Sequence, residues 1–188
     1  MAVYAGNTGN DPDKRIPAKL GEQLGLTELD DNMRADDGVT SLKVITGRWR
    51  GVYIPYTSKA IHWHTDGYCN PQDLQIGELL LHCVSPAAKG GENALPDHGN
   101  ACIHLRDTSP DYIKAFMAND VMTIPANIQS GKEIRPDCTG PVFPVLQDGS
   151  VHMRYAACTR SIEWKTDPVT RAAVKTLSQF LALDSHFI

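Results

Sequence analysis

Apolar and polar residues alternate in several short runs through the chain, and a period of two predicts β-strands. Residues 74–84 are almost continuously apolar, which favours a central strand buried on both faces. An Asp-Gly pair between two apolar runs is typical of a tight hairpin, and Gln147-Asp148-Gly149 is such a place. The expected strands are residues 2–5, 42–46, 52–56, 59–64, 74–84 and 121–126, with hairpin arms at 142–146 and 150–155.

Other segments repeat apolar residues every three or four positions, which predicts helices. Asp97, Ser109 and Asp167 stand where capping residues begin three of them, and Gly25 is suited to ending the first. Many short strands with a few helices indicate a β-rich α+β class, with a sandwich or barrel as its natural architecture. The expected helices are residues 16–24, 97–106, 109–117 and 168–183.

Composition narrows the function classes. The 188 residues fit one domain spanning 1–188, and 41% hydrophobic with 21% charged residues is typical of a globular protein. A net charge of −4 without basic runs gives no reason to expect nucleic acid, and no apolar stretch reaches membrane-spanning length. Five cysteines without a C-x-x-C pair argue against a disulfide framework. We therefore expect a reducing, cytoplasmic location.

The candidate chemistry lies in residues 61–68, Ile-His-Trp-His-Thr-Asp-Gly-Tyr. In an extended strand His62, His64 and Asp66 point to one face, because side chains alternate. Imidazole and carboxylate together suit iron, zinc, copper or manganese. A short motif of this kind also occurs by chance, so the other interpretation is a buried strand end whose histidines bond to the backbone.

Three motifs follow one another in order: residues 63–68 (WHTDGY), 81–86 (LHCVSP) and 90–93 (GGEN). With Asp36-Asp37-Gly38 before them, they resemble the TauD/TfdA family of dioxygenases, in particular its γ-butyrobetaine-hydroxylase-like members. The resemblance runs from about residue 20 to the end of the chain. It implies a double-stranded β-helix, a jelly-roll-like barrel with flanking helices. It also implies Fe(II) as cofactor, 2-oxoglutarate as co-substrate and hydroxylation of a small polar or acidic molecule.

Carried over residue by residue, the resemblance assigns His64 and Asp66 as iron ligands. His62 stands where relatives vary, so we expect it to lie in the core or to support a ligand. Asn93, directly after Gly-Gly-Glu, matches the residue whose amide contacts 2-oxoglutarate, and a turn asparagine is the alternative.

Four further residues are candidates for the substrate. Tyr68 and Asn70 follow the ligands and would suit a small polar molecule, although loop packing explains them equally well. Arg154 and Arg160 are the best cations for a carboxylate near the site, with surface charge on the hairpin as the alternative.

The family's third ligand, a histidine, and its 2-oxoglutarate arginine follow a strand that comes after the helix expected at 168–183. This sequence ends at Ile188. The expectation is thus a domain incomplete at its C-terminal end, with the last strands missing, weak iron binding and impaired activity. An open sheet edge would favour pairing with another chain, a homo-oligomer. The alternatives are a zinc-binding β-barrel that uses His62, His64 and Asp66 together, and a metal-free binding module.

Overall fold

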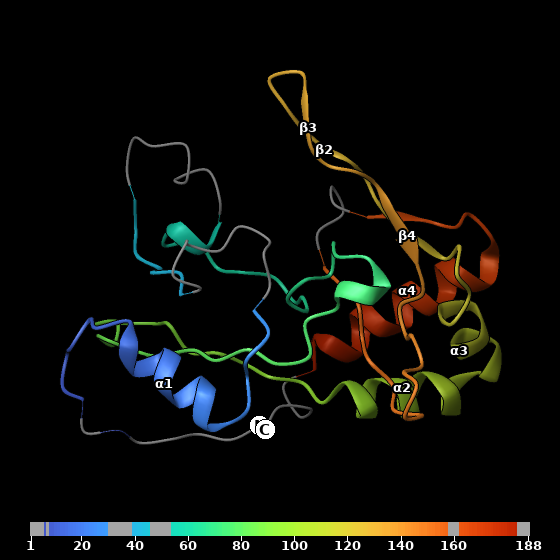
Figure 1. The fold of residues 1–188 in the computed structure, drawn as a ribbon. Coiled ribbons are helices and arrows are strands. Elements are labelled where there is room, and N and C mark those ends of the chain that lie inside the picture. Colours follow the sequence, from blue (N-terminus) through green and yellow to red (C-terminus); the bar gives the residue numbers. More distant parts are fainter. Residues whose placement is uncertain (1–5, 7, 30–38, 46–53, 158–161, 184–188) are drawn as a thin grey trace. The chain divides into compact units, whose positions relative to one another are not determined.

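The computed structural model describes residues 6, 8–29, 39–45, 54–157 and 162–183 (Figure 1). Contacts divide the chain into two units. The first unit consists of Met1–Lys59 and Ile76–Asn93, and the second of Ala60–Gln75 and Ala94–Ile188. The second unit contains His64 and Asp66, so the site can be described within that unit.

In the first unit the expected N-terminal helix is confirmed as α1, Arg15–Gln23. Gly25 ends it with φ of +81°, a conformation that glycine adopts without strain, while the Leu26 amide donates to the Gly21 carbonyl. The short 3-10 helix η2, Ile54–Tyr56, follows later in the chain.

Most strands expected before residue 86 are not found. Leu79 and Leu81 are 58% and 64% exposed, and residues 76–84 form neither helix nor strand. The prediction of a central buried strand at 74–84 is therefore wrong: its apolar side chains find no neighbouring strand among the described residues. Residues 72–74 form the 3-10 helix η3, Gln72–Leu74.

The other early strands are not formed in the described residues either, and the strand expected at 52–56 is wrong for residues 54–56, which form η2. Residues 42–45 and 59–63 are irregular, although the Ile45 amide donates to the Tyr56 carbonyl at 2.9 Å. The strand expected at 2–5, the Asp36-Asp37-Gly38 motif and parts of the strands at 42–46 and 52–56 lie outside the described residues.

Among its described residues, the second unit has three α-helices close to the expected positions: α2 (His98–Thr108), α3 (Pro110–Phe116) and α4 (Pro168–Leu181). Local chemistry begins each one. The Asp97 carboxylate accepts from the Gly99 amide at 2.7 Å, and Asp167 accepts from Thr170 at 2.9 Å. Pro110 occupies the first turn of α3, where its missing N–H costs nothing.

Two small antiparallel sheets accompany these helices. Strands β4 (Cys138–Gly140), β1 (Met122–Ile124) and β5 (Glu163–Trp164) form a sheet in the order β4-β1-β5, with Thr123 opposite Thr139 and Glu163. Strands β2 (Asn127–Gln129) and β3 (Lys132–Arg135) form a hairpin that extends away from the helices (Figure 1). The expected strand at 121–126 is confirmed as β1, and the content is mixed α and β with small sheets.

The expected hairpin at 142–155 is confirmed at its turn. Val145 and Val151 form an antiparallel bridge, the Leu146 amide donates to Ser150 at 2.8 Å, and Gly149 adopts φ of +83°. The arms are joined by separate hydrogen bonds and not by a continuous β-ladder; for example, the Arg154 amide donates to the Val142 carbonyl at 2.8 Å.

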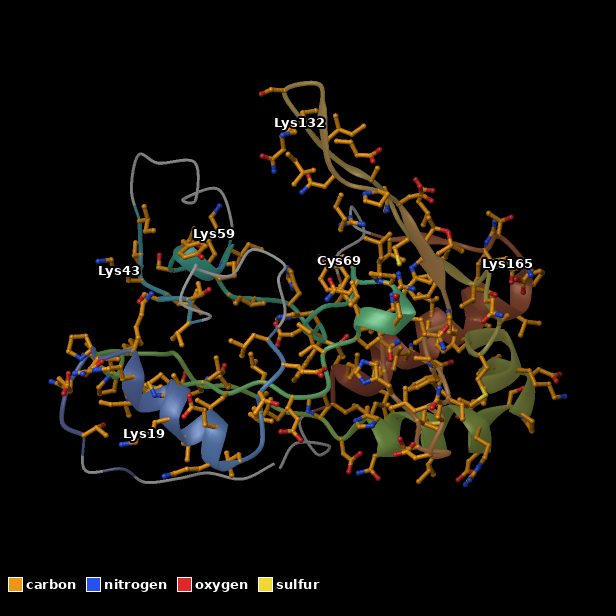
Figure 2. All side chains as sticks on the ribbon, in the orientation of Figure 1. Lys19, Lys43, Lys59, Cys69, Lys132 and Lys165 are labelled. Carbon is orange, nitrogen blue, oxygen red and sulfur yellow. The ribbon has the colours of Figure 1, made fainter. Side chains whose placement is uncertain are left out.

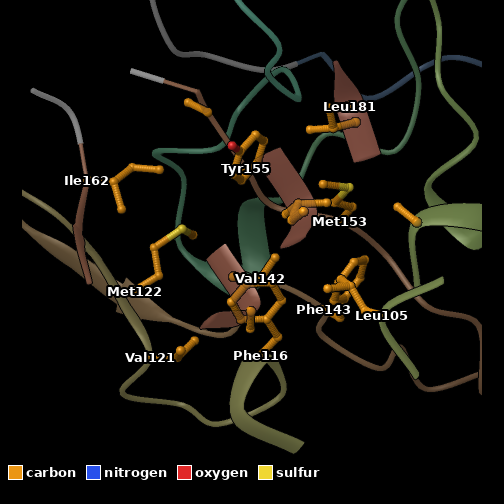
Figure 3. Packing of buried hydrophobic residues seen from close by; sticks show 14 of the residues in the cluster. Leu105, Phe116, Val121, Met122, Val142, Phe143, Met153, Tyr155, Ile162 and Leu181 are labelled. Carbon is orange, nitrogen blue, oxygen red and sulfur yellow. The ribbon is translucent and has the colours of Figure 1, made fainter. Parts of the chain in front are cut away.

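The core of the second unit lies between the helices and the segments around residues 142 and 155 (Figure 3). Phe116, Phe143 and Leu105 are completely buried, and Leu177 from α4 packs with them. The Phe116 ring stacks on Trp164 with centroids 5.9 Å apart. This core supports residues 153–156, which in turn hold the segment with the metal-ligating candidates.

Candidate metal centre

Residues 63–65 pair with residues 155–157 by backbone hydrogen bonds. The Thr65 amide donates to the Tyr155 carbonyl at 2.8 Å, and the Ala157 amide donates to Trp63 at 2.6 Å. The Tyr155 amide donates in turn to the Thr65 hydroxyl at 3.0 Å. Because Tyr155 is only 4% exposed, this pairing fixes the candidate ligands to the core.

Side chains alternate along this segment as the sequence predicts. His62, His64 and Asp66 are exposed, whereas Trp63 and Thr65 between them are half-buried. His64 bridges to Ala156 in antiparallel pairing. The two ligand candidates therefore share one face of the chain, away from the core.

His64 and Asp66 also come close to each other. Nε2 of His64 lies 3.9 Å from Oδ1 of Asp66, and the two side chains are 34% and 46% exposed. Two ligands that each bind an ion at about 2.1 Å lie at most about 4.2 Å apart. The pair thus fits one divalent ion, and a rotation of the exposed Asp66 side chain would bring the ligands into adjacent positions.

Backbone geometry determines which His64 nitrogen is free. Nδ1 of His64 lies 2.8 Å from the His62 carbonyl oxygen. A carbonyl can only accept, so Nδ1 donates a proton to it, and Nε2, the atom that faces Asp66, is the nitrogen available to a metal ion. Metal-binding histidines commonly have this arrangement, in which the other ring nitrogen donates to a carbonyl.

A complete ligand set is not present in the described part of the chain. No group of three His, Cys, Asp or Glu side chains that could hold a metal ion occurs there. The His62 side chain in particular does not join His64 and Asp66 in such a group. The donors present are one imidazole and one carboxylate, a combination that suits Fe(II) among other divalent metals.

Asn70 stabilises the turn after the ligands. It is 5% exposed, its amide nitrogen Nδ2 donates to the Leu74 carbonyl at 2.9 Å, and its backbone N–H donates to Gly67 at 2.8 Å. The Cys138 thiol donates to the Asn70 carbonyl at 3.4 Å. Loop packing therefore accounts for the Asn70 side chain, while Tyr68 beside it is half-buried against the core.

Arg154 lies next to the same turn and is only 3% exposed. Its Nε donates to the Tyr68 carbonyl at 2.7 Å, and its Nη2 donates to the Cys138 carbonyl at 2.8 Å. Burial lowers the pKa of its guanidinium. The interpretation of Arg154 as a surface charge on the hairpin is therefore wrong.

The two remaining candidates, Asn93 and Arg160, lie outside the described residues of the second unit. Asn93 belongs to the first unit, where its amide nitrogen lies 3.4 Å from the Gly91 carbonyl, as in a turn asparagine. Arg160 lies outside the described residues.

Two features of the site were missed in the sequence. One is the Thr65–Tyr155 pairing, which joins residues ninety positions apart, and the other is the contact of Arg154 with two carbonyls. Only the alternation at 150–155 hinted that this arm is a partner for another strand.

The packing leaves a cavity of about 240 Å³ near Trp63, lined also by Tyr155, Trp164 and Leu181. Neither His64 nor Asp66 lines it.

Comparison with known proteins identifies the family to which the chain belongs. Residues 17–187 match the family described as taurine catabolism dioxygenase TauD, TfdA family. Among curated proteins, a uridine-5'-phosphate dioxygenase of a Streptomyces species is 33% identical over 101 residues, 53% of this chain and 35% of the relative. A uridine-5'-phosphate dioxygenase of an Amycolatopsis species is 31% identical over 96 residues, 50% of this chain and 32% of the relative.

The matched segments span about a third of the length of these curated relatives.

In the described ranges no helix is both long and apolar enough to cross a membrane. The family match, by contrast, extends over nearly all of the 188 residues and includes the segment with His64 and Asp66. The chain therefore belongs to the TauD/TfdA family of dioxygenases, whose members generally use Fe(II) and 2-oxoglutarate.

Proposed function

We propose that this chain contributes to an Fe(II)- and 2-oxoglutarate-dependent dioxygenase that hydroxylates a small polar or acidic molecule. Family membership supports the reaction class. The observation that carries the proposal is the 3.9 Å approach of His64 Nε2 to Asp66 Oδ1, with the proton of His64 held on the other nitrogen. The family's double-stranded β-helix is proposed with it.

In this proposal His64 and Asp66 hold the iron, and the other residues position 2-oxoglutarate and the substrate. When bound, Fe(II) would supply the oxidative chemistry, in which dioxygen gives one oxygen atom to 2-oxoglutarate, which becomes succinate and carbon dioxide, and the other to a C–H bond of the substrate. Asn93 is proposed to donate its amide to 2-oxoglutarate. Tyr68 would border the substrate, and Arg160 would supply positive charge near its acidic group. Asn70 and Arg154 were candidates for the same roles, but they are only 5% and 3% exposed and bond to backbone carbonyls, so they would support this region from behind.

We further propose a phosphate-bearing nucleoside as the first substrate to test. Both curated relatives are named as dioxygenases of uridine 5'-phosphate. Such a molecule is small, polar and acidic, which agrees with the class expected from the motifs. A monophosphate requires cationic or N–H donors, and its position near the site would be tested by competition with inorganic phosphate.

The test is an anaerobic reconstitution of the purified chain with Fe(II), followed by addition of oxygen, 2-oxoglutarate and uridine 5'-phosphate. In keeping with the impaired activity expected from an incomplete ligand set among the described residues, we expect succinate to form only slowly, and we expect His64→Ala or Asp66→Asn to abolish it. His62→Ala is the matched control, because it keeps the backbone carbonyl through which His62 contacts His64. Succinate formation that persists in His64→Ala would contradict the assignment of the ligands.

A second readout does not depend on turnover. A ligand that binds only the folded state raises the melting temperature by mass action. We expect Fe(II), or Co(II) as an air-stable substitute, to raise the melting temperature of the wild type and of His62→Ala but not of His64→Ala. Equal loss of this shift in His62→Ala and His64→Ala would instead indicate a site built from both histidines.

A further inference from the structure

Arg154 is a buried cation whose partners are all neutral. Its guanidinium donates to the carbonyls of Tyr68 and Cys138, and no carboxylate of a described residue forms an ion pair with it. Burial is the main influence on the pKa of this guanidinium, and it lowers it. A charge is expensive to bury, so a buried arginine without an acidic partner needs a reason.

The two accepting carbonyls belong to segments far apart in the sequence. Tyr68 lies two residues after Asp66, and Cys138 begins β4. Arg154 itself lies next to Tyr155, whose backbone pairs with Thr65. One guanidinium thus connects three chain segments immediately behind the turn that follows the metal-ligating pair. Cys69, labelled in Figure 2, marks this turn.

The surrounding packing leaves little freedom for this guanidinium. A Cβ added at Gly140 would lie 3.0 Å from Nη1 of Arg154, closer than ordinary van der Waals contact. Glycine at the end of β4 therefore lets the guanidinium reach the Cys138 carbonyl. The planar fork of arginine can donate to two acceptors in fixed directions, which the single ammonium of lysine does less well.

We propose that Arg154 is a positioning residue: it fixes the Asp66–Asn70 turn against β4 and so holds the Asp66 carboxylate next to His64. The effect on metal binding rests on the proposed function. The contact that fixes the Asp66–Asn70 turn does not, because it is present without a metal ion. It gives Arg154 a role through the backbone instead of direct contact with a substrate.

The test compares variants that disturb this contact from two sides. Arg154→Gln removes the charge, Arg154→Lys keeps it without the fork, and Gly140→Ala pushes on the intact guanidinium from β4. Gly77→Ala is the control, because a Cβ at Gly77 would meet nothing within 4 Å. Each variant is examined by urea denaturation, by hydrogen exchange and by anaerobic titration with Co(II).

We expect faster amide exchange in peptides covering residues 63–70 and 138–140, with α2 and α4 unchanged, in Arg154→Gln and Gly140→Ala. Outer contacts of this kind typically change metal affinity about tenfold or more, so we expect Co(II) dissociation constants to rise about tenfold in Arg154→Gln. Arg154→Lys should restore part of the affinity, and Gly77→Ala should match the wild type.

A uniform rise in exchange over all peptides, or none, would overturn the proposal, because Arg154 would then act on general stability or on nothing. Local exchange with an unchanged Co(II) affinity would overturn it as well. Failure of the wild-type chain to bind Co(II) would instead contradict the proposed function, and the exchange data would still decide whether Arg154 fixes the turn.

Discussion

Leu105 is a residue at which burial alone determines the effect of a substitution. It is 0% exposed on α2, whereas Ile103 on the same helix is 47% exposed. We expect Leu105→Ala to lower the free energy of unfolding by about 2–5 kcal/mol through lost burial and a residual cavity. Ile103→Ala should lower it by much less, and urea denaturation of both variants measures the difference. Similar losses in the two variants would mean that the core is packed elsewhere.

His152 predicts a pH dependence of stability. Burial, and then the charge of His98, lower its pKa below the usual 6.5. The unfolded chain therefore binds a proton more readily than the folded one. The stabilisation from neutral His152 is complete above about pH 6.5 and is lost as the pH falls from there toward the folded-state pKa.

Denaturation curves between pH 5 and pH 8 check this sign. We expect the free energy of unfolding to fall with acidification in the wild type, and to fall less steeply in His152→Gln. His104→Gln serves as the control, since His104 stacks on Phe180 at a centroid distance of 4.9 Å in another part of this unit. A steeper acid loss in His152→Gln than in the wild type would reverse the assignment.

At the residue scale, sequence reasoning succeeds where chemistry and spacing coincide. His64 and Asp66 can be read from an alternating motif because a period of two places them on one face whatever the rest of the chain does. Arg154 could not be interpreted in this way. Its burial depends on Tyr68 and Cys138, which are 86 and 16 positions away, and nothing local distinguishes it from an exposed arginine.

At the scale of the element, Asp97 provides a test of local helix chemistry. Its Oδ1 accepts from the amides of Gly99 and Asn100, groups that have no partner inside the helix. We expect Asp97→Ala to lower the free energy of unfolding by about 1 kcal/mol. Asp97→Asn keeps an accepting oxygen and should change it little, so thermal or urea denaturation of the pair isolates the capping contact.

Helices and strands differ in how far the sequence determines them. The helices α1, α2, α3 and α4 begin and end near their expected residues, because caps, proline and glycine act within a few positions. The stretch at 74–84 has the apolar residues of a strand without a partner among the described residues, whereas β2 and β3 around Gly131 were not expected at all. Strand formation depends on a distant neighbour, which composition does not reveal.

At the scale of the whole molecule, the distribution of packing predicts where the chain opens. The second unit has a continuous core, while residues 76–95 form no helix or strand and carry exposed Leu79, Leu81 and Leu95. We expect amides in 76–95 to exchange with deuterium within seconds, and those in α2 and α4 to exchange by global unfolding. Hydrogen exchange at several urea concentrations checks this, and protection of 76–95 equal to that of α4 would contradict it.

The expected class is confirmed only in its coarser form, a mixture of α and β with small sheets. The double-stranded β-helix stays a proposal from the family, since periodicity predicts strands but not how they close. One domain over 1–188 likewise stays a prediction.

One consequence follows from the contact between Nδ1 of His64 and the carbonyl of His62. The orientation of the ligand is set by a peptide group, which every amino acid supplies. Selection can therefore replace the side chain at position 62 freely, provided that the main chain keeps its course. The variation among relatives that the resemblance implies at this position is what a contact through the main chain permits.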